Sequence, residues 1–196
     1  MNTVQEEIAA TAARMVVEDG LEYGPAKRRA VKQLGLTARA QLPNNDQVED
    51  AVREYLELFC ADTQPAELAA LRELAVVWMA RTAAFRPHLG GSVWRGTATA
   101  LSDIYLQLFC DDSKSAEISL IDHDVRYEVS TVRGFQGGDV DALSVLCTCP
   151  GFAQRVLVHL MIYDLDDLRG ALKPDSQGRS QRGDLSALRN LIKGVE

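Results

Sequence analysis

The stretch Leu89-Gly90-Gly91-Ser92, followed after ten intervening residues by Asp103-Ile104-Tyr105-Leu106, decides the expected fold. Two glycines and a serine predict a sharp turn, because glycine adopts backbone conformations that other residues rarely adopt. From Asp103 onward, apolar and polar residues alternate through residue 110, which predicts a strand with two different faces. One face carries Ile104, Leu106, Leu108 and Cys110, and the other carries Asp103, Tyr105, Gln107 and Phe109.

Three further runs downstream of this strand are also β-like. Residues 125–131 alternate, and residues 143–149 and 156–163 are rich in β-branched and apolar residues. The Pro150-Gly151 pair separates the last two runs, so we expect them to form a hairpin. Upstream, helical spacing of apolar residues predicts helices through most of the first 86 residues, with Asp46 expected as the N-cap of one of them.

These patterns predict an α+β fold in which an N-terminal helical region packs on a small mixed β-sheet. The expected divisions are a helical region over residues 1–86, an α/β core over 87–172, and a loop with a C-terminal helix over 173–196. The last boundary rests on Pro174, Gly178 and Gly183, which predict an exposed loop before the final helix.

Composition narrows the classes of partner. The net charge of −7 over 196 residues argues against binding of nucleic acid through the whole surface. No apolar run reaches the roughly 18–20 residues needed to span a bilayer, so no membrane partner is expected. The first residues are acidic and lack the basic start of a signal peptide, which favours a cytoplasmic location. The four cysteines are expected to be small buried hydrophobic residues.

The Gly-Ser turn followed by a carboxylate that opens an apolar strand resembles the signature of the DNA-polymerase-β-like nucleotidyltransferase superfamily. The resemblance covers roughly residues 80–170. It implies that the turn opens a helix, that Gly91 and Ser92 hold a nucleoside triphosphate, and that Arg95 lies near the phosphates. It also implies Mg²⁺ as a cofactor, bound by Asp103 and by an acid from a hydrophobic-acid-hydrophobic triplet on a neighbouring strand. Glu128, within Tyr127-Glu128-Val129, matches that triplet.

Tyr105 departs from the family pattern, which has a second acid two residues after the first. A phenol with an ordinary pKa near 10 is a poor ligand for Mg²⁺, which prefers hard anionic oxygens. Gln107 on the same face offers only a neutral oxygen. The resemblance therefore implies a degenerate member in which Mg²⁺ binding is weak and Tyr105 contributes to nucleotide binding instead.

The expected function is binding of a nucleotide or a protein partner through the inherited cleft, with catalysis impaired. Two alternatives stay open. The first is an active nucleotidyltransferase that uses Asp103 and Glu128 with one Mg²⁺. The second is a regulatory or interaction module, in which a basic helix contacts nucleic acid or protein; its positive charges are Lys27, Arg28, Arg29, Lys32 and Arg39. The sequence names neither the nucleotide nor the partner.

Overall fold

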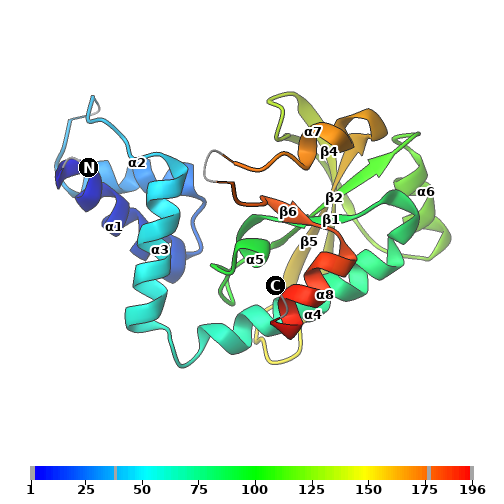
Figure 1. Cartoon of the computed structure of the whole chain (residues 1–196), viewed down its shortest axis with the longest axis horizontal. Coiled ribbons are helices and arrows are strands. Elements are labelled where there is room, and N and C mark those ends of the chain that lie inside the picture. The colour runs from blue at the N-terminus through cyan, green and yellow to red at the C-terminus, as the bar shows by residue number, and fades with distance from the viewer. Residues whose placement is uncertain (1–2, 38, 176–177, 195–196) are drawn as a thin grey trace. The chain divides into compact units, whose positions relative to one another are not determined.

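The computed structural model describes residues 3–37, 39–175 and 178–194 (Figure 1). It has an α+β fold, as expected, and divides into two compact units. One unit comprises residues 1–65 with 99–101, and the other comprises residues 66–98 with 102–196. Each unit is considered by itself below.

The helical unit contains α1 (Thr3–Asp19), α2 (Tyr23–Gln33) and α3 (Asn45–Phe59). Its core is formed by small and branched residues at helical spacing, among them Ile8, Ala12, Ala26, Val48 and Val52. Asn44, rather than Asp46, caps α3. The Asn44 side chain accepts a hydrogen bond from the backbone N–H of Gln47, whose side chain in turn accepts one from the backbone N–H of Asn44. Asp46 lies in the first turn, where its charge is favourable.

The second unit, called the sheet unit below, begins with α4 (Gln64–Arg81) and the short η1 turn (Ala83–Phe85). The chain then forms β1 (His88–Gly90), α5 (Gly91–Arg95), β2 (Ile104–Cys110), α6 (Ser115–Asp122), β3 (Glu128–Arg133), β4 (Asp139–Cys147) and β5 (Val156–Asp164). It ends with η2 (Leu165–Asp167), α7 (Leu168–Ala171), β6 (Arg182–Gly183) and α8 (Leu185–Lys193).

The strands form one mixed sheet in the order β3-β4-β5-β2-β1-β6. β4 and β5 pair antiparallel, which confirms the expected hairpin. β2 lies between β5, with which it is parallel, and β1, with which it is antiparallel. β1 and β6 fall in segments that the sequence predicted as turn and loop, and they pair antiparallel with each other.

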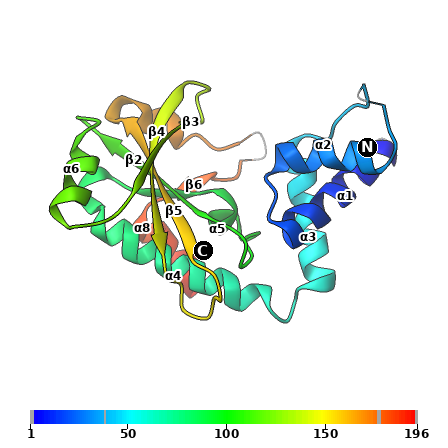
Figure 2. The same ribbon diagram turned by 180° about the vertical axis from the view of Figure 1, so that it is seen from behind.

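The two faces of the sheet differ in chemistry, as the alternation along β2 predicts. One face packs against α4 and carries the main core, with Leu106, Leu108, Val158 and Leu160 fully buried alongside Leu71 of α4. The opposite face, called the polar face below, carries Asp103, Tyr105 and Gln107. At one end of the polar face, Phe109 and Tyr163 stack and form a small second cluster with Ala171. Figure 2, the view from the opposite side, shows α4 running along the sheet.

The boundary between the units falls at Pro65, earlier than the division at residue 86 that the sequence suggested. The reason is that α4 buries Leu71, Ala75, Trp78 and Met79 against the strands. Helical periodicity reports that α4 has a buried face, but it does not report which partner covers that face.

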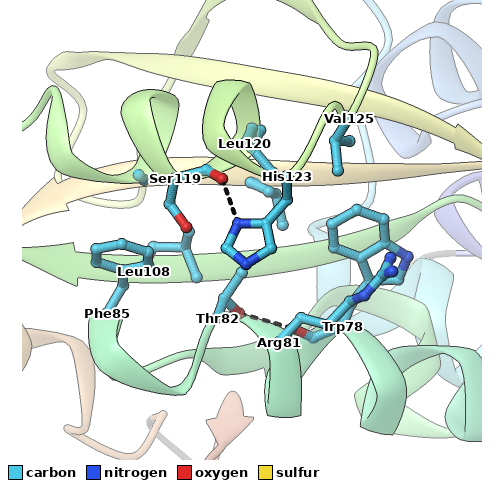
Figure 3. A pocket seen from close by; sticks show the side chains of 11 residues that line it. Trp78, Arg81, Thr82, Phe85, Leu108, Ser119, Leu120, His123 and Val125 are labelled. Carbon is cyan, nitrogen blue, oxygen red and sulfur yellow. Dashed lines mark hydrogen bonds between the residues drawn. The ribbon is translucent and has the colours of Figure 1, made fainter.

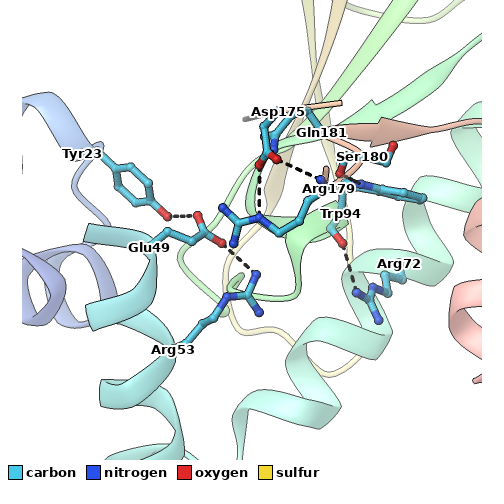
Figure 4. A network of polar contacts seen from close by, with 9 residues as sticks. All are labelled: Tyr23, Glu49, Arg53, Arg72, Trp94, Asp175, Arg179, Ser180 and Gln181. Atoms are coloured by element: carbon cyan, nitrogen blue, oxygen red, sulfur yellow. Dashed lines mark hydrogen bonds and ion pairs between the residues drawn. The ribbon is translucent and has the colours of Figure 1, made fainter. Parts of the chain in front are cut away.

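Trp94 of α5 holds the edge strand β6 in place. Its indole Nε1 donates a hydrogen bond of 2.9 Å to the Ser180 carbonyl (Figure 4). Its ring covers Gly183. A Cβ atom built on Gly183 would lie 2.1 Å from Cη2 of the Trp94 ring, a distance that no relaxed structure contains. Glycine at residue 183 is therefore required by close packing.

Gly183→Ala is expected to lower the free energy of unfolding by about 1–3 kcal/mol, because the ring must move away from β6. Urea unfolding measures this change. Gly138→Ala is the matched control, since a Cβ there meets nothing within 4 Å; it should change stability by less than about 0.5 kcal/mol. Equal effects of the two substitutions would contradict the packing described.

Candidate functional site

The candidate site is a row of side chains that crosses the polar face of the sheet. Strand pairing places one residue from each strand side by side, and paired residues project from the same face. In strand order from β3 to β6, the row contains Glu128, Ser144, His159, Tyr105, Gly90 and Arg182. Sequence positions from 90 to 182 therefore meet along one line.

Tyr105 lies at the centre of this row. Its ring stacks on the His159 imidazole with centroids 4.9 Å apart and planes inclined by 23°. On its other side lies the Gly-Ser turn, where a Cβ on Gly91 would approach the Tyr105 ring to 3.4 Å. Gly91 also has a φ of +69°, which disfavours other residues. The structure thus brings Gly91 and Tyr105 together.

Asp103 directly precedes β2, and its carboxylate contacts His159. The distance from His159 Nε2 to Asp103 Oδ2 is 3.4 Å, and the distance from His159 Nδ1 to Ser144 Oγ is 2.8 Å. When the Ser144 hydroxyl donates to Nδ1, Nε2 carries the ring hydrogen and points it at Asp103. These residues form a continuous chain from carboxylate through imidazole to hydroxyl.

Glu128 does not lie near Asp103. It belongs to β3, and the order β3-β4-β5-β2 places two whole strands between them. Three inter-strand spacings of about 4.8 Å separate β3 from β2 by roughly 14 Å. Asp103 and Glu128 therefore cannot share one ion in this arrangement, and the strand that neighbours β2 presents Val158-His159-Leu160 where the family resemblance implied an acid.

The residues around Asp103 do not fit Mg²⁺. Its carboxylate contacts the His159 imidazole, on which the Tyr105 ring stacks, whereas Mg²⁺ prefers several carboxylate, phosphate or water oxygens in octahedral geometry. Among the residues that the structure describes, no group of three or more His, Cys, Asp or Glu side chains is placed to hold a metal ion.

The other end of the row holds unpaired polar groups. Nε and Nη1 of Arg182 are buried without a hydrogen-bond partner among the described residues, and so is Oε1 of Gln107, a residue that is 8% exposed. The Arg182 guanidinium lies 4.4 Å from the centroid of the Phe135 ring, and its burial lowers its pKa. A Cβ on Gly90 would lie 3.8 Å from Gln107 Nε2 and 4.0 Å from Arg182 Cβ, so both side chains border this glycine.

Removing a guanidinium from water costs free energy when no carboxylate pairs with it. Binding of an anionic ligand to the guanidinium would offset that cost. Gly90 lies between Tyr105 and Arg182 in the row. Because glycine has no side chain, the space between these two residues stays open. The arrangement offers two N–H donors from Arg182 and one acceptor from Gln107. It suits a ligand that carries both an anionic group and a hydrogen-bond donor.

α5 holds the remaining sequence-predicted residues. Ser92 lies in its first turn and Arg95 is its last residue. Arg72 of α4 anchors this helix by donating a hydrogen bond of 3.2 Å to the Val93 carbonyl. It donates another of 3.3 Å to the Trp94 carbonyl (Figure 4). Ser92 and Arg95 thus lie on a fixed short helix that begins at Gly91, next to the Tyr105 ring.

The sequence did not assign His159, Ser144 or Arg182 to the site. Alternation shows which face of its own strand each residue occupies, but the neighbours of that face depend on strand order. Arg182 lies in a segment expected to be loop, where no periodic pattern was available. The sequence shows only that Arg182 precedes a glycine. The importance of that glycine became clear when the structure placed the Trp94 ring against Gly183.

Cys110, Cys147 and Cys149 do not form a reactive site. Burial raises the pKa of the Cys110 thiol to about 11 and also raises the pKa values of Cys147 and Cys149. These thiols are protonated at neutral pH, which makes them weak nucleophiles. Cys110 and Cys149 are buried, as expected for small hydrophobic residues.

Part of the basic cluster on α2 stabilises the helical unit itself. Lys27 donates to the Pro43 carbonyl and to Asn45 Oδ1, and Arg29 pairs with Asp19 at 3.1 Å. In the same unit, Glu49 is 3% exposed, accepts a hydrogen bond from the Tyr23 hydroxyl and pairs with Arg53 (Figure 4). The positive charges of Lys27 and Arg29 are thus used in contacts within the helical unit, and their presence requires no external partner.

Over the described residues, none of the helices combines the length and apolarity that a bilayer crossing requires. No protein-family model matches the chain, and no curated protein is significantly similar to it in sequence.

Proposed function

We propose that this protein binds a nucleotide on the polar face of its sheet without a two-metal catalytic step. The observation that carries the proposal is the half-buried Arg182 beside Gln107, whose Nε and Nη1 atoms are buried without a hydrogen-bond partner among the described residues. Arg182 lies in the same row as Tyr105, next to the Gly91 turn. A nucleotide supplies what these groups lack, because its phosphate is an anion and its sugar and base carry hydroxyl or amino donors. The resemblance to nucleotidyltransferases at Gly91, Ser92 and Asp103 supports the same class of ligand.

The chemistry around Asp103 argues for binding rather than nucleotidyl transfer. Two-metal transfer requires carboxylates that converge on both ions. Here Asp103 contacts His159, Tyr105 occupies the second acid position, and Glu128 is three strands away. We therefore propose that nucleotide binding does not require Mg²⁺.

Arg182→Met tests the proposal, because its effects on binding and on stability should have opposite signs. The substitution should weaken nucleotide binding by about 10- to 150-fold, the value of one or two charged hydrogen bonds. Without nucleotide, the variant should be as stable as the parent chain or more stable, since a buried unpaired cation has been removed. Thermal unfolding with ATP and with GTP, each in Mg²⁺ and in EDTA, measures both quantities.

Arg133→Met is the matched control, because Arg133 is exposed at the end of β3. It should leave nucleotide-dependent stabilisation unchanged. The proposal fails if neither nucleotide stabilises the parent chain, or if Arg182→Met binds as the parent does. Stabilisation that appears only with Mg²⁺ would instead favour the alternative of an active transferase.

The chain Asp103–His159–Ser144 supports a second candidate, in which Ser144 is the nucleophile of an acyl-transfer reaction. The His159 ring nitrogen at 2.8 Å would take the hydroxyl proton as Ser144 Oγ forms its bond to an acyl carbon, and would return that proton to the leaving group. Asp103 would orient the ring and stabilise its protonated form.

A fluorophosphonate probe distinguishes this candidate from simple nucleotide binding. If Ser144 is activated, the probe adds once to the native chain, and intact-mass spectrometry detects the adduct. Ser144→Ala should abolish the adduct and His159→Gln should slow its formation by at least tenfold. Ser130→Ala is the control, because Ser130 lies on β3 on the same face of the sheet as Ser144. This variant should form the adduct at the rate of the parent chain. An unlabelled parent chain would remove the nucleophile candidate.

A further inference from the structure

A pocket lies on the side of β2 and β5 opposite the polar face. Leu108 of β2 and Leu160 of β5 form its floor. Side chains from α4, η1 and α6 form its walls (Figure 3). The pocket holds about 130 Å³ and lies entirely within the sheet unit. It shares no lining residue with the row of side chains on the polar face.

The inner surface of the pocket is mainly apolar and aromatic. Trp78 and Phe85 line it from α4 and η1, and Leu120 and Val125 line it from the α6 side. The Trp78 indole is fixed, since its Nε1 donates to Cys147 Sγ at 3.2 Å. An apolar cavity of about 150 Å³ is large enough to bind benzene. The volume here therefore suits a single ring or a short branched chain.

Two basic side chains border this apolar space. The Arg81 guanidinium lies 5.2 Å from the centroid of the Trp78 ring, and no carboxylate pairs with it among the described residues. His123 caps the C-terminus of α6, where its Nδ1 lies 2.7 Å from the Ser119 carbonyl. Because that carbonyl accepts a hydrogen from Nδ1, Nε2 is the ring nitrogen left to face a ligand. Figure 3 shows the His123 imidazole reaching from α6 toward α4.

The Thr82 hydroxyl in the pocket wall is neutral, so it does not compete with an anionic ligand for Arg81. Thr82 is 4% exposed, and its Oγ1 donates a hydrogen bond of 2.7 Å to the Trp78 carbonyl one turn earlier. The lining thus combines an enclosed apolar space with a guanidinium and an imidazole, and it includes no acidic side chain. A cation and a polar donor at the edge of an apolar pocket fix the orientation of a ligand that has an apolar body and one anionic end.

We propose that this pocket binds a small carboxylic acid with an aromatic or branched apolar body. The body lies between Trp78, Phe85 and Leu120, and the carboxylate pairs with Arg81 beside His123. Arginine is suited to this role because its planar donors match the two oxygens of a carboxylate. The site is independent of the proposed nucleotide site, since it lies on the other face of the sheet.

Benzoate is the test ligand, and benzyl alcohol is its neutral counterpart of similar size. Calorimetric titration of the full chain should show saturable benzoate binding at least tenfold tighter than binding of the alcohol. Arg81→Met should weaken benzoate binding by about tenfold and remove the preference for the acid. Arg133→Met should leave both affinities unchanged, because Arg133 lies on the strand at the far edge of the sheet.

Ala116→Leu tests the location of the ligand separately from its charge. Ala116 lines the pocket and is 2% exposed, so a larger side chain there fills the space while Arg81 remains. Both ligands should then fail to bind, and amide chemical shifts that move with benzoate in the parent chain should cluster on α4, η1 and α6. Absence of saturable benzoate binding, equal affinity for the alcohol, or shifts that cluster around Tyr105 would each overturn the proposal.

Discussion

The central strand β2 is the constraint on which the rest of the sheet unit depends. Ile104, Leu106 and Leu108 are fully buried on the face that packs against α4, while Asp103, Tyr105 and Gln107 project from the other face. Sliding β2 by one residue relative to β5 and β1 would exchange these faces. It would bury carboxylate and phenol against α4 and expose leucines. Burial of the leucines therefore fixes the register that assembles the row of polar side chains.

The position of edge strand β6 depends on β2 indirectly, through β1. β1 pairs with β2, β6 pairs with β1, and Trp94 packs directly on Gly183. As a result Arg182 is held over Phe135 even though burial removes water from its guanidinium. A fold that keeps an unpaired cation at such a position gives up stability, and ligand binding is one physical reason for that cost. The central strand β2 separates two chemically different surfaces, since Leu108 of β2 forms part of the floor of the pocket on the face opposite the polar face.

Local pattern predicted the elements best where they were long. Alternation identified β2, and the apolar runs on either side of Pro150-Gly151 identified the β4–β5 hairpin. β1 and β6 escaped prediction because segments of three and two residues carry no measurable period. The cap of α3 was misplaced by two residues because Asn44 and Asp46 are both good caps, and only the reciprocal bonds with Gln47 distinguish them. The α4 boundary was misplaced because periodicity does not identify a packing partner.

By itself, the sequence determined the α+β class and the two-faced character of β2, because these follow from side chains that are close along the chain. Tertiary structure decided that His159, rather than Glu128, neighbours Asp103, and that Arg182 joins the same row. It also formed the pocket from α4, α6 and two strands. The physical reason is that strand order and helix docking are set by burial summed over distant segments, which no local pattern of residues contains.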